Sequence, residues 1–289
     1  MMYDCIIIGS GPAGISAALT LQANKKEFLL FGSEELSQKI VKAETIHNYP
    51  GLTDVSGKEF CAALKAQLSA AKITVKTEKV AGVYALKEKF SVMTQAGEAY
   101  EAKTVILACG VESVKQIEGE ETYLGRGVSY CATCDGFLYK NKTIAVICTT
   151  KALEHEIGYL ADLAKKVYLI PMYKEVEIDR ENVTLIRKMP VKIDGEMRVK
   201  NLTFADSPTE EIPSVLPIDG VFMLRDCVSP AVLVGGLEMQ EGHVVVSRDM
   251  STNLKGCFAA GDCTGRPYQY AKAAGEGNVA AHSVCAFLK

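Results

Sequence analysis

The sequence predicts an α/β fold with parallel β-sheets, and two observations predict it. Short, continuously apolar runs such as Cys5 to Ile8 are typical of strands that are buried on both faces of a sheet. A pattern of strand, helix and strand also occurs twice along the 289 residues. Because connections of this kind join parallel strands, we expect one or two α/β domains.

The first of these units begins at the N-terminus. After the strand Cys5 to Ile8, the chain reads Gly9-Ser10-Gly11-Pro12-Ala13-Gly14. A helix is expected next, because apolar residues recur on one of its faces, at Ile15, Ala18, Leu19 and Leu21. A second apolar run, Phe28 to Phe31, completes the unit.

The second unit lies near the middle of the chain. Thr104 to Ala108 is expected to be a buried strand, and the polar stretch from Cys109 through Gln116 could be a linker. The strand Thr143 to Cys148, a helix around Leu153 to Ala164 and the strand Val167 to Ile170 then repeat the pattern. A final helix, from about Glu276 to Phe287, is rich in small residues suited to close packing.

Composition excludes several classes of function. The formal net charge of −3 gives no sign of the basic surface that a nucleic-acid binder needs to neutralise phosphates. No apolar segment approaches the length of a membrane span, and the N-terminus lacks the basic region of a signal peptide. Ten cysteines in a chain of this length fit a reducing cytoplasm better than a disulfide scaffold. We therefore expect a cytoplasmic protein that binds neither nucleic acid nor membrane.

The glycine motif predicts a dinucleotide site in a Rossmann-like domain. Gly9 permits a tight turn, Gly11 lets the backbone approach a pyrophosphate, and Gly14 lets the helix pack closely. The helix N-terminus then offers unpaired N–H groups and a positive dipole end to the anion. An acidic residue about twenty positions later should bind a ribose hydroxyl, and either Glu34 or Glu35 is close enough, although both could simply begin a solvated loop.

A second motif, Cys131-Ala132-Thr133-Cys134, predicts dithiol redox chemistry. A CxxC can also be half of a zinc site, but the chain has no second CxxC or CxxH, so we expect no metal. Asp135 follows directly and is positioned to exchange a proton with a departing thiolate, or else only to cap a helix or face solvent.

The run from Gly125 to Gly136, which contains the CxxC, resembles the active-site stretch of the low-molecular-weight thioredoxin reductases. Further segments carry the same resemblance over nearly the whole chain: the glycine motif, Asn48-Tyr49-Pro50-Gly51, Gly261-Asp262, Gln269 and Ala274-Gly275-Glu276-Gly277. It implies two Rossmann-like three-layer α/β domains. A discontinuous FAD-binding domain (1–113 and 229–289) would surround an inserted CxxC domain (114–228) with a degenerate NADPH-binding fold.

The resemblance also assigns roles to single residues. It implies that Cys134 faces the flavin, that Cys131 attacks the partner disulfide and that Asp135 is the acid/base. It places Asp262 on the ribityl chain of FAD and Gln38, Asn48 and Gln269 near the flavin. The cofactor-binding set that we expect is Gly9, Ser10, Gly11, Pro12, Ala13, Gly14, Glu34, Gln38, Asn48, Asp262, Gln269 and Tyr270. A homodimer that reduces thioredoxin is implied as well.

Two parts of the family's NADPH site are missing. After the strand Thr143 to Ile147, the chain continues Cys148-Thr149-Thr150-Lys151-Ala152, with no glycine to let the backbone approach phosphate. Ile170-Pro171-Met172-Tyr173-Lys174 stands where the family has the basic cluster that meets the 2′-phosphate. The chain therefore resembles the branch of ferredoxin-dependent flavin thioredoxin reductases, which work without pyridine nucleotide.

We therefore expect ferredoxin to reduce FAD, FAD to reduce the Cys131–Cys134 disulfide, and the dithiol to reduce thioredoxin. Segment 136–200 holds 12 Lys and Arg against 9 Asp and Glu, an excess that could attract an acidic ferredoxin or simply be solvated surface. Two alternatives stay open: a flavin-dependent dithiol oxidase that uses oxygen, and a flavin redox sensor without turnover.

Overall fold

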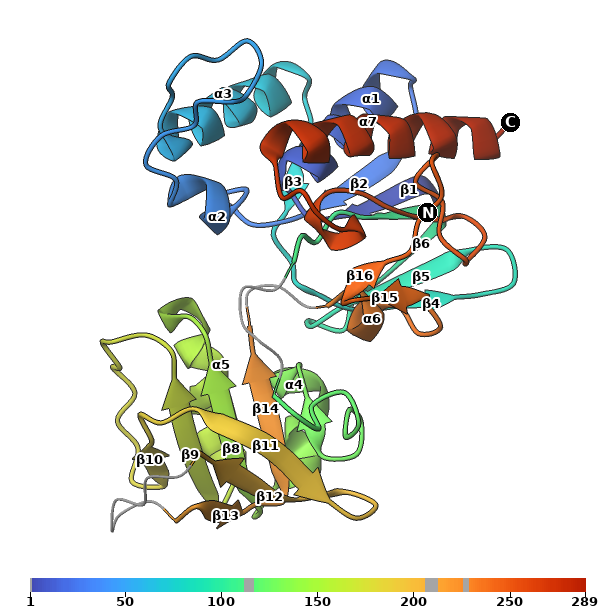
Figure 1. Ribbon diagram of the computed structural model, residues 1–289. Coiled ribbons are helices and arrows are strands. Elements are labelled where there is room, and N and C mark those ends of the chain that lie inside the picture. The colour runs from blue at the N-terminus through green and yellow to red at the C-terminus, as the bar shows by residue number, and fades with distance from the viewer. Residues whose placement is uncertain (1, 112–116, 206–212, 226–228) are drawn as a thin grey trace. The chain divides into compact units, whose positions relative to one another are not determined.

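The computed structural model describes residues 2–111, 117–205, 213–225 and 229–289, and Figure 1 shows its elements. The chain divides into two compact units. Unit 1 comprises Met1–Glu112 and Cys227–Lys289, and unit 2 comprises Ser113–Asp226. Two segments that lie far apart in the sequence therefore build unit 1.

Unit 1 is organised around a seven-stranded sheet whose central strands are parallel. Its order is β3-β2-β1-β6-β5-β4, and β17 pairs with the C-terminal half of β6. The hairpin of β4 and β5 joins β6 in antiparallel pairing. The bounds are β1 (Met2–Ile8), β2 (Phe28–Phe31), β3 (Val75–Lys76), β4 (Val80–Ala85), β5 (Phe90–Thr94), β6 (Ala99–Leu107) and β17 (Cys257–Ala259). The predicted parallel sheet is confirmed.

Helices cover one face of this sheet, as Figure 1 shows for α1, α3 and α7. A small hairpin of β15 (Met239–Gln240) and β16 (His243–Val244), with α6 (Pro230–Leu233), packs on the other face. The helices of the first face are α1 (Pro12–Ala23), α2 (Gln38–Val41), α3 (Gly57–Ala70) and α7 (Tyr270–Phe287). Apolar cores lie on both faces, which explains why β1 reads as a continuous apolar run.

Sequence signals explain where two of these helices begin. Helix α1 has Gly11 as its N-cap and Pro12 in its first turn, where the missing N–H is not needed. Helix α3 begins with a capping box, in which Ser56 Oγ accepts a hydrogen bond from the Glu59 N–H while the Glu59 carboxylate accepts one from the Ser56 N–H.

The predicted start of the last helix was wrong, because α7 begins at Tyr270 and not near Glu276. The six additional residues include three alanines and a lysine, which favour the helical conformation. The helix therefore begins at Tyr270, with Gln269 as its N-cap. The close packing expected of its small residues is confirmed: a Cβ on Gly277 would lie 2.0 Å from the Ala13 carbonyl oxygen of α1.

Unit 2 contains a five-stranded parallel sheet in the order β10-β9-β8-β14-β7. Its strands are β7 (Val128–Ser129), β8 (Thr143–Cys148), β9 (Lys166–Pro171), β10 (Val183–Leu185) and β14 (Gly220–Leu224). A separate antiparallel sheet is formed by β11 (Pro190–Gly195), β12 (Val199–Phe204) and β13 (Val215–Pro217). The strand order reverses between β8 and β14, which is where a doubly wound sheet opens a crevice for ligands.

The described part of unit 2 also has the helices α4 (Ala132–Asp135) and α5 (Glu154–Leu163) and the 3-10 helices η1 (Gly136–Tyr139) and η2 (Lys151–Leu153). Helix α5 packs its buried face, with Ile157 and Leu160, on the sheet core. Within the described ranges of both units, no helix combines the length and the apolar character needed to cross a membrane.

A buried ion pair stabilises unit 2 next to β7 and β14. Arg225 is 2% exposed and donates from Nη2 to Oε2 of Glu120, which is 1% exposed, at 2.9 Å. Its Nη1 lies 2.9 Å from Glu120 Oε1. The Tyr130 hydroxyl and the Ile117 N–H donate to the same carboxylate. Because two full charges are removed from water here, the pair contributes only while both members are present.

We predict that Arg225→Met lowers the free energy of unfolding of unit 2 by about 3–5 kcal/mol, because Glu120 is left buried without its cation. Urea denaturation followed by circular dichroism measures this change. Lys192→Met is the matched control, since it removes an exposed pair with Glu118 at 3.2 Å and should cost less than about 1 kcal/mol. Equal losses in the two variants would contradict the prediction.

Candidate active site: a disulfide and a dinucleotide cradle

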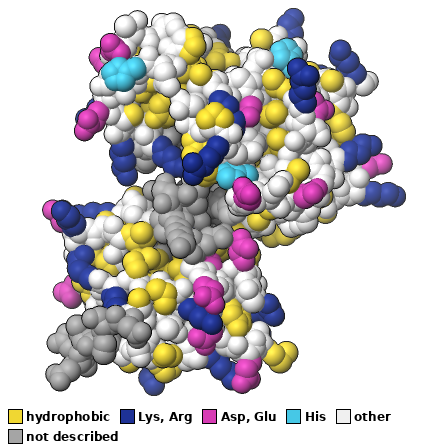
Figure 2. All heavy atoms as spheres, viewed as in Figure 1, with side chains coloured by type: hydrophobic (Ala, Val, Ile, Leu, Met, Phe, Trp, Pro, Cys, Tyr) yellow, Lys and Arg dark blue, Asp and Glu magenta, His cyan; other side chains and the backbone are white. Residues whose placement is uncertain are grey.

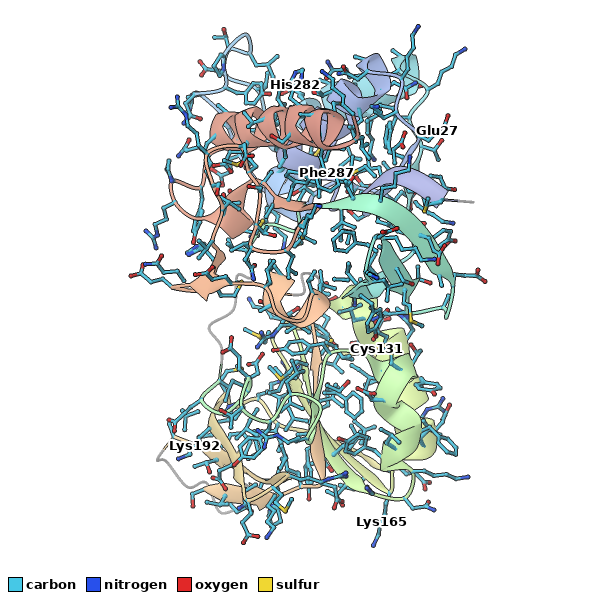
Figure 3. The ribbon with its side chains drawn as sticks, turned by 90° about the vertical axis from the view of Figure 1, so that its right-hand side faces the viewer. Glu27, Cys131, Lys165, Lys192, His282 and Phe287 are labelled. Carbon is cyan, nitrogen blue, oxygen red and sulfur yellow. A yellow bond between two sulfur atoms is a disulfide. The ribbon has the colours of Figure 1, made fainter. Side chains whose placement is uncertain are left out.

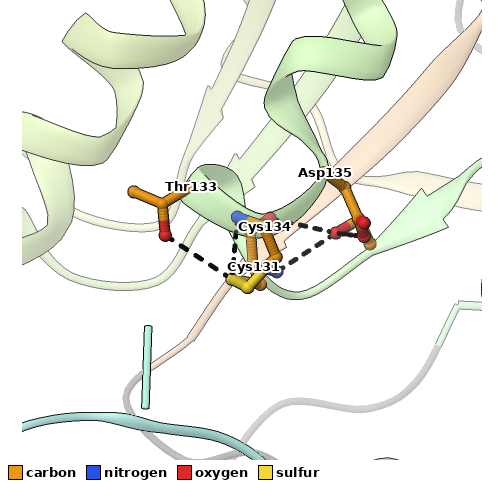
Figure 4. Close-up of a disulfide and its surroundings, with 5 residues drawn as sticks. Cys131, Thr133, Cys134 and Asp135 are labelled. Carbon is orange, nitrogen blue, oxygen red and sulfur yellow. Dashed lines mark hydrogen bonds between the residues drawn. A yellow bond between two sulfur atoms is a disulfide. The ribbon is translucent and has the colours of Figure 1, made fainter. Parts of the chain in front are cut away.

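The structure closes Cys131 and Cys134 into a disulfide with an S–S distance of 1.98 Å and a Cα–Cα distance of 5.3 Å. Cys131 is the N-cap of α4, and its Sγ accepts a hydrogen bond of 3.2 Å from the Cys134 N–H (Figure 4). The Thr133 hydroxyl lies 3.7 Å from the same sulfur. When the disulfide is reduced, this N–H can stabilise a thiolate on Cys131.

Asp135 is connected to Cys131 through Ser129, which ends β7. The Ser129 hydroxyl donates to Asp135 Oδ2 at 2.7 Å and accepts from the Cys131 N–H at 3.1 Å. Ser129 is 3% exposed, so its hydroxyl is fixed by the protein alone. Sequence reasoning did not select Ser129, and its only signal was its place two residues before the first cysteine.

The disulfide lies on an accessible part of unit 2. Cys134 and Thr133 are exposed, and η1 directly after α4 presents Phe137 and Leu138 with exposed fractions of 68% and 66%. Figure 3 shows Cys131 and Lys165 at opposite ends of unit 2, which places the disulfide beyond the carboxyl ends of its parallel strands. Exposed apolar side chains beside a disulfide suit a protein partner.

In unit 1 the three glycines of the first motif have two different functions. A Cβ on Gly9, whose φ is +116°, would lie 2.2 Å from the Ala108 carbonyl oxygen, and one on Gly14 would lie 1.8 Å from the Gly9 carbonyl oxygen. A Cβ on Gly11 would meet no atom within 4 Å. Gly9 and Gly14 are therefore required by packing, whereas the open space at Gly11 fits an approaching pyrophosphate at the N-terminus of α1.

Ser10 organises the loop that carries the two candidate ribose-binding acids. Its buried hydroxyl donates to the Leu36 carbonyl at 2.7 Å and accepts from the Ser33 N–H at 3.0 Å. Both acids are exposed, and Glu35 pairs with Lys65 of α3 at 3.3 Å. The Ser10 side chain therefore holds this loop in place through two hydrogen bonds.

The predicted flavin contacts from the first and last thirds of the chain converge in part. The Asn48 amide donates to the Gln269 side-chain oxygen at 2.6 Å, although 221 residues separate them. Burial raises the pKa of Tyr270, and the charge of Asp262 raises it further. The side chain of Gln38, at the start of α2, lies outside the part of the chain that the structure describes.

Asp262 begins the 3-10 helix η3 (Asp262–Thr264), just beyond β17. A Cβ on the preceding Gly261 would lie 3.0 Å from the Ala13 Cβ, so this loop contacts the start of α1. Burial raises the pKa of Asp262, and the positive charges of Lys39 and Lys272 oppose that rise. An acid at this place, beside an open glycine cradle, fits the sugar portion of a dinucleotide.

The corresponding segment of unit 2, from Thr149 to Glu156, makes its polar contacts within the protein. The Thr149 N–H donates to the Leu224 carbonyl at 3.0 Å and so links the ends of β8 and β14. At the start of α5, where phosphate would bind, the Glu154 carboxylate accepts from the Glu177 N–H at 3.2 Å. Lys151 pairs with Glu177 at 2.5 Å, and Glu156 is buried. Carboxylates in this position repel phosphate.

No metal centre was expected, and the described residues contain no group of three His, Cys, Asp or Glu side chains that could hold an ion. The fold and the disulfide instead define a disulfide oxidoreductase with two dinucleotide-binding-type units. The pattern of the family "Pyridine nucleotide-disulphide oxidoreductase", whose members bind FAD, matches residues 3–277. The chain belongs to this family, and within it to the low-molecular-weight thioredoxin reductases.

Individual relatives support this assignment. The thioredoxin reductase of Helicobacter pylori is 35% identical over 100% of this chain and 99% of its own length. That of Aquifex aeolicus is 33% identical over 90% of this chain and 85% of its own length. The crystal structure of a ferredoxin-flavin thioredoxin reductase from Clostridium acetobutylicum superimposes with a TM-score of 0.88 at 44% identity, covering 99% of this chain and 98% of that one.

We predict that iodoacetamide at pH 8 modifies Cys131 and Cys134 after reduction but leaves buried thiols unmodified. Burial raises the pKa of Cys148 to about 11 and those of Cys5 and Cys257 to about 12. At pH 8 only about one Cys148 in a thousand is then a reactive thiolate. Peptide mapping by mass spectrometry checks this, with a guanidinium-denatured sample as control. Equal labelling of Cys148 in the folded protein would contradict it.

Proposed function

We propose that this chain is a flavin-dependent disulfide reductase that takes electrons from ferredoxin and delivers them through Cys131–Cys134 to thioredoxin, without NADPH. One observation supports the proposal: the disulfide has its Ser129–Asp135 connection, while the segment of the same unit where nucleotide phosphates would bind carries Thr149, Lys151 and Glu154 and no glycine. Electrons must then enter by a route other than a pyridine nucleotide in unit 2.

FAD would be held by unit 1. Gly11 and the N-terminus of α1 would meet its pyrophosphate, Asp262 would bind the ribityl chain, and Asn48 with Gln269 would lie near the ring system. The bound flavin would supply the two electrons that the disulfide requires. The family of the chain supports FAD as the cofactor.

The chain's own residues account for the thiol steps. Reduction of the Cys131–Cys134 bond takes up two electrons and two protons. Cys131 Sγ then attacks one sulfur of the partner's disulfide, which forms a mixed disulfide and expels the partner's second sulfur as a thiolate. Cys134 attacks Cys131 Sγ, restores the internal disulfide and releases the partner's dithiol. Asp135, held by Ser129, gives a proton to the departing thiolate.

Thioredoxin as the substrate is supported by the named relatives and by the exposed Phe137 and Leu138 beside the disulfide. Ferredoxin as the donor is supported by the likeness to the Clostridium acetobutylicum protein. Charge gives little support, because Figure 2 shows Lys and Arg interspersed with Asp and Glu on the face in view. We also propose a homodimer and a cytoplasmic location, both on family resemblance alone.

The donor is tested by anaerobic titration of the flavin. We expect reduced ferredoxin to bleach the flavin and support thioredoxin reduction, whereas NADPH and NADH fail at useful rates, because the segment that would bind their phosphates lacks glycine and carries the carboxylate of Glu154. Stopped-flow absorbance measures each rate, with an NADPH-dependent thioredoxin reductase as the positive control. Rapid bleaching by NADPH would overturn the proposal. Failure with several ferredoxins, together with fast oxygen-coupled dithiol oxidation, would favour an oxidase.

The flavin site is tested by Gly11→Val. A branched side chain would fill the open space at Gly11 without touching the packing contacts of Gly9 and Gly14, so we expect a folded protein that purifies with little FAD. Flavin absorbance per protein measures the content. Gly235→Val, at another glycine in unit 1 with open space around it, is the control and should retain its flavin. Full occupancy in Gly11→Val would show that this motif is not the cradle.

A further inference from the structure

A lysine and a glutamate of α7 form a clasp around the loop that carries Asp262. Lys272 Nζ donates to the carbonyl oxygens of Gly261 and Gly265, both at 2.8 Å, and to Thr264 Oγ1 at 2.9 Å. It also lies 3.0 Å from Glu276 Oε2, one helical turn further on. The ammonium group, with three protons to donate, is thus surrounded by four oxygens.

Glu276 binds the same loop through its carboxylate. Glu276 Oε2 accepts from the Gly261 N–H at 2.9 Å and lies 2.8 Å from Thr264 Oγ1. Gly261 therefore has its N–H bound by the anion and its carbonyl bound by the cation of one ion pair. Gly261 and Gly265 both have positive φ, at +89° and +122°. Because glycine can adopt many backbone conformations, other groups have to hold this loop in one of them.

This arrangement differs from an ordinary i, i+4 pair on a helix surface, which faces solvent and contributes little. The side chains of Lys272 and Glu276 are only 19% and 20% exposed, and most of their hydrogen bonds go to the loop 261–265. Charge-assisted hydrogen bonds of this kind are among the stronger ones in proteins. The pair therefore acts on the loop more than on the helix.

We propose that Lys272 and Glu276 are positioning residues that hold the Asp262 loop in the conformation that binds the flavin cofactor. The inference rests on the proposed flavin site of unit 1. Asp262 lies inside the clasped segment, and Gly261 contacts the start of α1 at Ala13, so a shift of the loop would move Asp262 relative to the glycine cradle. A preformed loop lowers the ordering cost that FAD binding would otherwise bear.

The test compares FAD affinity and loop mobility in the full-length apoprotein. We expect Lys272→Met to raise the dissociation constant of FAD about tenfold, as judged by titration of flavin fluorescence. Amide hydrogen exchange of a peptide covering 261–265 should accelerate, while that of β1 stays as in the wild type. Lys103→Met is the matched control, since it removes a pair with Asp4 at 2.9 Å from the opposite end of the same sheet.

A double-mutant cycle tests whether the two residues act as one clasp. Glu276→Gln should weaken FAD binding in the same direction, and the double variant should lose little more than Lys272→Met alone. Wild-type affinity in Lys272→Met, additive losses in the cycle, or weaker binding without faster exchange at 261–265 would each overturn the inference. Failure of the wild-type protein to bind FAD would instead overturn the proposed function.

Discussion

Close backbone contact around Ala13 is the constraint on which the proposed cofactor site of unit 1 depends. Gly9 and Gly14 bring the start of α1 onto the ends of β1 and β6, and Gly277 lets α7 approach the Ala13 carbonyl. Gly261 brings the loop after β17 to the same place. Segments from the first and last thirds of the chain thus meet at glycine and alanine residues, whose small size permits close contact. This packing brings Asp262 close to the glycine motif, although the two lie far apart in the sequence.

Unit 2 shows what the same architecture becomes when the glycines are absent. Thr149 and Thr150 follow β8, and the chain forms a short 3-10 helix before α5 instead of a bare cradle. Glu154 begins α5 and accepts from the Glu177 N–H, and Lys151 pairs with the Glu177 carboxylate. The Glu154 carboxylate is engaged by the Glu177 N–H, and no glycine leaves bare backbone for a phosphate, so the fold is kept without the features of a phosphate site.

Much of this could be predicted from local sequence. Strands such as Phe28–Phe31 and Thr143–Cys148 were predicted at their observed bounds, because burial on both faces leaves a continuous apolar run. Contacts between distant segments could not be predicted in this way. The Glu120–Arg225 pair spans 105 residues, and the partners of Lys272 depend on where the loop 261–265 folds back, which no periodicity records. Ser129 was missed because its bond to Asp135, six residues on, depends on how the chain turns between β7 and α4, which the apolar pattern does not record.

The disulfide and the nucleotide crevice can evolve separately because they use different parts of the sheet in unit 2. The crevice lies between β8 and β14, and the disulfide follows β7 on the far side of β14. A cradle for phosphate needs bare backbone and a free helix N-terminus, whereas a CxxC needs only a turn, one N–H and a nearby acid. Filling the first with Glu154 and Lys151 therefore leaves Cys131, Cys134 and Asp135 unaltered, so a change of electron donor need not alter the thiol chemistry.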